Sequence, residues 1–80
     1  ESGSWRDPKS YLQEISQRVD NQTPVYKVLS EEGPDHDKVF TLGVFVGDNM
    51  MGRGIGPSKQ VAQQQAARAA IAKYKESGEK

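Results

Sequence analysis

Cysteine is absent from this chain, so neither a disulfide framework nor a thiolate metal site can stabilise its fold. The single histidine, His36, has no second histidine with which to form a zinc site and no serine or cysteine arrangement that indicates a catalytic triad. No apolar run approaches the roughly 18 residues of a membrane span, and the first residues lack the pattern of a secretory signal. With 80 residues, the chain is at most one domain. We therefore expect an intracellular module, in the cytoplasm or the nucleus and not secreted, with no membrane partner, no cofactor and no metal.

An excess of charge of one sign is also lacking, because the 11 basic and 11 acidic residues cancel. The two kinds are nevertheless segregated along the chain. Segment 27–50 has two basic residues against five acidic ones, whereas segment 53–80 has six basic residues against two acidic ones. An anionic partner would therefore be held by the C-terminal part of the chain.

Two helices are predicted, one towards each end of the chain. The first covers residues 7–20, because Asp7 suits the N-cap and Pro8 suits the first helical position. Its apolar stripe has the spacing i, i+3 and i+7 and consists of Leu12, Ile15 and Val19. The second helix runs from about 58 to 75, where alanines recur at helical spacing.

Three strands are predicted between the helices. The first covers residues 25–32 and is followed by a turn-rich loop at 33–36. The clearest strand covers 38–47, with alternate apolar residues at Phe40, Leu42, Val44 and Val46. A third strand is expected around 50–53. This order predicts an α+β fold, α-β-β-β-α, with a three-stranded antiparallel sheet packed against two helices on one face. We expect residues 1–6 to be a linker or tag, 7–75 to be the domain and 76–80 to be a flexible tail.

Three glycines, at positions 52, 54 and 56, come shortly before the second helix. A glycine-rich loop that leads into a helix, with Lys59 at the junction, is suited to hold a phosphate, because backbone N–H groups and the helix dipole both favour an anion. The spacing G-x-G-x-G matches neither the P-loop nor the dinucleotide-binding pattern. Two interpretations remain: the glycines serve only a strand exit and a tight turn, or they help to hold a phosphate backbone at the start of the helix.

Three stretches together resemble the double-stranded RNA-binding domain. They are "DPKSYLQE", "PVYKVLSEEGPDHDKVFTLGVFV" and "GRGIGPSK..A...AA", in the order and at the spacings of that family, over residues 7–74. Within the family they are most similar to the C-terminal domain of ribonuclease III enzymes. The resemblance implies a core formed by residues whose spacing already predicts burial: Leu12, Tyr26, Phe40, Leu42, Val44, Ala62, Ala66, Ala70 and Ile71.

The resemblance also implies how A-form RNA would be bound, through three surfaces that together span about 16 bp. The first helix would enter one minor groove with the polar side chains of Ser10, Gln13 and Glu14. The loop, which has the family pattern G-P-x-H, would enter the next minor groove with Gly33, Pro34 and His36. The start of the last helix would meet phosphates across the intervening major groove with Ser58, Lys59, Gln60 and Gln63, and Arg53 would add a further cation.

Two of these positions depart from the family. It commonly has S-K-K-x-A-K or, in ribonuclease III enzymes, S-K-K-x-A-E, where this chain has Gln60 and Gln63. An amide can still bond a phosphate oxygen, but more weakly than an ammonium group, so RNA affinity should be lower. Without the resemblance, simpler interpretations stay open: the polar face of the first helix is only solvated, and His36 is a surface or capping residue.

We predict non-catalytic binding of double-stranded RNA by shape, as the RNA-binding module of a ribonuclease III-type endoribonuclease. The chain itself is not expected to be an enzyme, because the ribonuclease III pattern E-x-L-E-F-x-G-D does not occur in it. Further candidate partners are a nuclease domain of the same parent chain and another protein. The alternative function is a protein–protein interaction or dimerisation domain of the same fold with weakened RNA binding. Gln60 and Gln63 favour that alternative. The retained family residues disfavour it: Gln13, Glu14, His36 and Lys59.

Overall fold

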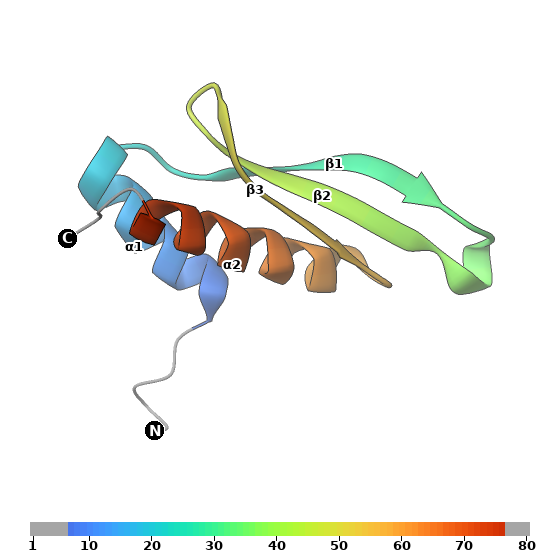
Figure 1. The fold of residues 1–80 in the computed structure, drawn as a ribbon. Coiled ribbons are helices and arrows are strands. Elements are labelled where there is room, and N and C mark those ends of the chain that lie inside the picture. Colours follow the sequence, from blue (N-terminus) through green and yellow to red (C-terminus); the bar gives the residue numbers. More distant parts are fainter. Residues whose placement is uncertain (1–6, 77–80) are drawn as a thin grey trace.

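Two helices and three strands make up the part of the chain that the computed structural model describes, residues 7–76. The elements are α1 (Pro8–Asp20), β1 (Val25–Glu32), the short 3-10 helix η2 (Asp35–Asp37), β2 (Val39–Val46), β3 (Asn49–Gly56) and α2 (Lys59–Glu76) (Figure 1). The linker predicted at 1–6 and all but the first residue of the tail predicted at 76–80 lie outside the described residues.

The strands form one antiparallel sheet in the order β1-β2-β3, and the helices lie together on one side of it (Figure 1). The longer helix, α2, packs against β3 and β2, and α1 packs against α2. The predicted α-β-β-β-α fold class is therefore confirmed.

The core lies between α1, α2 and the inner face of the sheet. Along β2, Leu42, Val44 and Val46 are buried and Phe40 is half-buried, as the alternating pattern predicts. Since successive side chains of a strand point to opposite faces, these residues face the helices and the odd-numbered ones face away. The buried cluster comprises Leu12, Ile15, Val44, Ala66, Ala67, Ala70 and Tyr74, with Tyr11, Tyr26, Met51 and Ile71 packed partly against it.

The apolar stripe predicted for α1 is only partly buried. Leu12 and Ile15 are fully buried, whereas the prediction that Val19 continues the stripe into the core is wrong, because its side chain is 47% exposed. The buried cluster ends on this helix at Ile15 and does not extend to the next apolar position. Ser16 is fully buried instead, and its hydroxyl donates a hydrogen bond to the Gln13 carbonyl oxygen at 3.2 Å.

The glycines at 52, 54 and 56 belong to a strand and not to a loop. We predicted that the third strand ends near residue 53, but β3 pairs with β2 as far as Gly56, which lies opposite Phe40. The interpretation of these glycines as a flexible loop with a tight turn is therefore wrong, since the strand exit comes only after Gly56, whereas phosphate binding at the start of the helix stays a prediction. The physical reason is that glycine, although weak in strands by itself, is tolerated where another backbone approaches closely.

The approaching backbone is that of α2. A Cβ atom at Gly54 would lie 2.3 Å from the Ala62 carbonyl oxygen, and one at Gly52 would lie 2.4 Å from the Ala66 carbonyl oxygen. Both alanines are fully buried. The glycines of β3 have no Cβ atom, and the facing alanines of α2 have only a methyl group. The helix can therefore pack almost directly against the strand.

Candidate nucleic-acid interface

The polar face predicted for α1 is exposed. Ser10, Gln13 and Glu14 are all accessible, because the opposite side of the helix carries the buried residues. They border a surface hollow of about 660 Å³, whose described lining is Ser10, Gln13, Glu14, Gln17 and Arg18. The Gln17 amide already donates a hydrogen bond to the Thr23 hydroxyl at 2.7 Å, so it has less capacity left for a ligand. Arg18 was not a sequence candidate, although its spacing of four residues from Glu14 indicates the same face.

The loop between β1 and β2 has a defined shape. Gly33 has a φ of 99°, which L side chains rarely adopt, and the Asp37 N–H donates a hydrogen bond to the Pro34 carbonyl oxygen at 2.9 Å. His36 lies within η2 and is exposed. The Gly-Pro pair therefore starts a turn that presents the imidazole at the end of the sheet.

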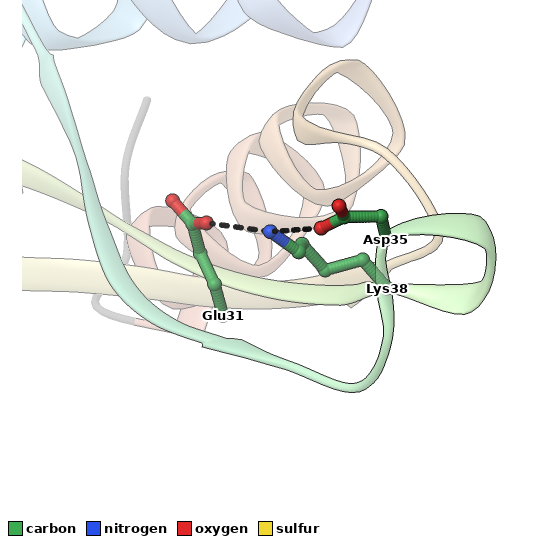
Figure 2. Close-up of polar contacts among 3 residues, drawn as sticks. All are labelled: Glu31, Asp35 and Lys38. Atoms are coloured by element: carbon green, nitrogen blue, oxygen red, sulfur yellow. Dashed lines mark ion pairs between the residues drawn. The ribbon is translucent and has the colours of Figure 1, made fainter.

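Lys38 ties this loop to the strand before it. Its Nζ lies 3.6 Å from Glu31 Oε1 and 3.6 Å from Asp35 Oδ1, so one ammonium bridges β1 and η2 (Figure 2). The bridge restrains the loop and offsets two of the carboxylates that would otherwise repel a phosphate backbone. Sequence inspection gave no sign of this role, because the pairing depends on how the loop folds back.

The start of α2 presents exposed polar and basic groups. The Ser58 hydroxyl accepts a hydrogen bond from the Val61 N–H at 3.2 Å and so acts as the N-cap of the helix. Lys59 and Gln60 follow and are exposed. The Lys59 ammonium lies 5.9 Å from the centroid of the Phe40 ring, close enough for a cation–π contact. Lys59 therefore lies at the positive end of the helix dipole and beside the start of β2.

Gln63 is joined to α1 by a lysine that sequence reasoning did not select. Lys9 Nζ donates a hydrogen bond to Gln63 Oε1 at 2.8 Å, and it lies 5.3 Å from the centroid of the Tyr26 ring. The two residues are 54 positions apart, so no local pattern indicates the contact. Tyr26 is half-buried beside them, and its hydroxyl is buried without a partner among the described residues. Burial, followed by the negative charge of Asp7, raises the pKa of Tyr26 to about 12.

Arg53 does not join the other candidates. It is exposed, and it alternates along β3 with Gly52 and Gly54, which face α2. Its side chain therefore belongs to the face of the sheet that turns away from the helices. It lines a separate hollow of about 560 Å³ with Leu29, Ser30, Thr41, Gly54, Ile55 and Gln65.

The described residues do not assemble other kinds of site. Over residues 7–76, no group of three or more histidine, cysteine, aspartate or glutamate side chains is placed to hold a metal ion. In the same range, neither helix combines the length and the apolar character needed to cross a membrane.

Comparison with known proteins gives a consistent result. Residues 8–74 match the family model described as double-stranded RNA binding motif. The chain is 48% identical over 68 residues to Ribonuclease 3 of Protochlamydia amoebophila, and 49% identical over 65 residues to Ribonuclease 3 of Lactococcus lactis. These matches cover 85% and 81% of the chain but 28% of each ribonuclease. The chain thus spans less than a third of the length of these relatives.

Solved structures agree with the sequence matches. A structure of Arabidopsis HYL1 superposes with a TM-score of 0.75 at 30% identity, covering 88% of this chain and 99% of that one. A structure of Dicer from Pichia stipitis gives a TM-score of 0.67 at 30% identity, covering 82% of this chain and 32% of that one.

Proposed function

The chain belongs to the double-stranded RNA binding motif family, and we propose on that basis that it recognises A-form RNA by shape through three surfaces. The first is the α1 face with Ser10, Gln13 and Glu14. The second is the loop with Gly33, Pro34 and His36. The third is the start of α2, where Ser58, Lys59, Gln60 and Gln63 lie.

The observation that carries this proposal is a series of contacts that joins the three surfaces. The loop leads into β2, where Phe40 lies opposite Gly56 at the end of β3. The Lys59 ammonium lies over the Phe40 ring, and one turn further along α2 Gln63 bonds Lys9 at the start of α1. These contacts link segments that are distant in sequence, which supports the proposal that one ligand spans successive grooves across them.

The chemistry of each surface fits the groove assigned to it. Hydroxyl, amide, carboxylate and imidazole groups can accept from or donate to the 2′-hydroxyls of a wide minor groove. Lys59 and the first N–H groups of α2 instead provide charge and donors suited to phosphates. Arg53 lies on the other face of the sheet, so it would contact only an RNA strand that passes the edge of β3.

We further propose that the chain positions RNA and does not cleave it. In a longer ribonuclease III-type protein, hydrolysis would be carried out by carboxylates and metal ions outside this segment. The isolated chain should accordingly leave duplex RNA intact when magnesium is present. Cleavage into defined products by the pure protein would contradict this part of the proposal.

A titration of one 16–20 bp sequence, made as duplex RNA and as duplex DNA, tests the groove assignment at matched salt. The parent chain should bind the RNA more tightly, because DNA lacks the 2′-hydroxyls. Gln13→Ala should weaken RNA binding. The matched change Gln17→Ala, one turn along the same helix, should matter less because that amide already bonds Thr23. Equal affinity for the two duplexes would refute minor-groove recognition.

One observation favours the second candidate function, a protein-interaction or dimerisation domain. The sheet face that turns away from the helices exposes large apolar side chains, each between 41% and 53% accessible: Val25, Leu29, Val39, Met50 and Ile55. Exposed apolar patches often mark interaction sites. Analytical ultracentrifugation over a range of concentrations tests this candidate. Dimerisation of the parent that is abolished in Ile55→Lys would support it. A monomer at all concentrations would count against self-association.

A further inference from the structure

Lys9 is a half-buried lysine in the first turn of α1 that the family resemblance did not mark as a contact. Its ammonium group donates a hydrogen bond to the Gln63 amide oxygen at 2.8 Å and lies over the Tyr26 ring. Neither of these two neighbours is a carboxylate, so neither cancels the positive charge, although the negative charge of Asp7 reaches the adjacent Tyr26. A lysine ammonium has three N–H donors, and the amide uses one of them.

The position of this ammonium is as informative as its charge. Ser10, on the α1 face proposed for the first minor groove, follows Lys9 directly. Gln63 lies one helical turn after Lys59, on the side of α2 proposed for the phosphates. The Lys9 ammonium therefore lies at the contact between α1 and α2, between the two proposed RNA-binding surfaces, where an RNA strand that reaches both of them would pass.

We propose that Lys9 is a phosphate-binding residue, supplying from α1 the positive charge that α2 lacks at Gln63. The inference rests on the proposed RNA binding and extends it to a residue on a different element. Gln63 positions the ammonium through a neutral hydrogen bond and leaves its charge to attract RNA.

Glutamine at position 63 is essential to this arrangement. A carboxylate there would bond the same ammonium as an ion pair and cancel its charge. A second lysine there would place two ammonium groups at contact distance, and they would repel each other. Gln63→Lys should therefore gain less RNA affinity than an added charge normally provides, whereas Gln60→Lys, on an exposed position without this neighbour, should gain more.

The test is a salt series for duplex RNA binding, combined with thermal unfolding of the same proteins. Lys9→Gln should make the log–log salt dependence shallower by about one unit, so that the loss of affinity between 50 and 200 mM salt is about fourfold smaller than in the parent. Gln63→Glu should have the same effect on the slope while leaving the melting temperature unchanged or higher. Lys9→Arg should preserve the slope, because it preserves the charge.

The control is Gln22→Glu, which makes the same change of charge at the opposite end of α1, beside Gly47. It should leave the slope unchanged. Equal slopes for the parent, Lys9→Gln and Gln63→Glu would overturn the inference while leaving RNA binding itself in place. If Gln22→Glu and Gln63→Glu reduced the slope of the salt dependence equally, the inference would also be overturned, since the change in net charge alone would then explain both results. Failure of the parent to bind duplex RNA would overturn the proposed function and this inference together.

Discussion

Gly54→Ala tests how closely α2 rests on β3. The new methyl group would lie 2.3 Å from the Ala62 carbonyl oxygen and 2.3 Å from the Ala66 backbone nitrogen. Favourable contacts need roughly 3.5 Å, so helix and strand would have to separate by about 1 Å. Both obstructing atoms belong to the backbone of a helix, and neither can rotate away as a side chain could.

The expected cost is at the upper end of the range for overpacking, about 3 kcal/mol. For a domain of this size, each kcal/mol lowers the melting temperature by about 4–8 °C, so the variant should melt roughly 12–24 °C below the parent. Thermal and urea unfolding, followed by far-ultraviolet circular dichroism, would measure both quantities.

Gly43→Ala provides the matched control. It is also a buried glycine in the same sheet, but its new methyl group would meet the ends of side chains, Met50 Sδ at 3.0 Å and Leu29 Cδ1 at 3.1 Å. These side chains lie on the exposed sheet face and can shift, so the change should cost less than about 1 kcal/mol. If Gly54→Ala and Gly43→Ala melt within a few degrees of each other, α2 is not held against β3 as described.

Three further residues give testable predictions. Lys59→Ala should make the salt dependence of RNA binding shallower by about one unit, while changing the free energy of unfolding by less than about 1 kcal/mol, as urea unfolding would show. Lys38→Met should weaken RNA binding in the same titration, because the two carboxylates that it bridges would no longer be offset; affinity equal to the parent's would contradict this role. Stability should fall as the pH rises from about 10 towards 12, because burial raises the pKa of Tyr26 above that of an unfolded tyrosine. Tyr26→Phe should reduce that alkaline loss and, by removing a buried hydroxyl without a partner, stabilise the fold by about 1 kcal/mol at neutral pH.

Local sequence pattern was sufficient to predict the elements and the exposed polar residues. Alternation along 38–47 predicts one buried face, and β2 has it, because a strand alternates its side chains whatever packs against it. Helical spacing likewise places Ser10 and Gln13 away from Leu12, and the structure exposes both. These properties depend only on backbone geometry within one element, which the order of residues already determines.

Contacts between elements could not be predicted in this way. Alternating glycines indicate a flexible loop when nothing is known to lie beside them, and only the position of α2 makes them the points where a helix approaches a strand. Val19 continues an apolar stripe, but its side chain stays 47% exposed. Lys9 and Gln63 are unremarkable polar residues until the packing of α1 on α2 brings them within 2.8 Å. The sequence by itself determined which elements form and which faces are polar. The tertiary structure decided which faces are covered and which side chains meet, because burial and pairing depend on two surfaces and a local pattern describes only one.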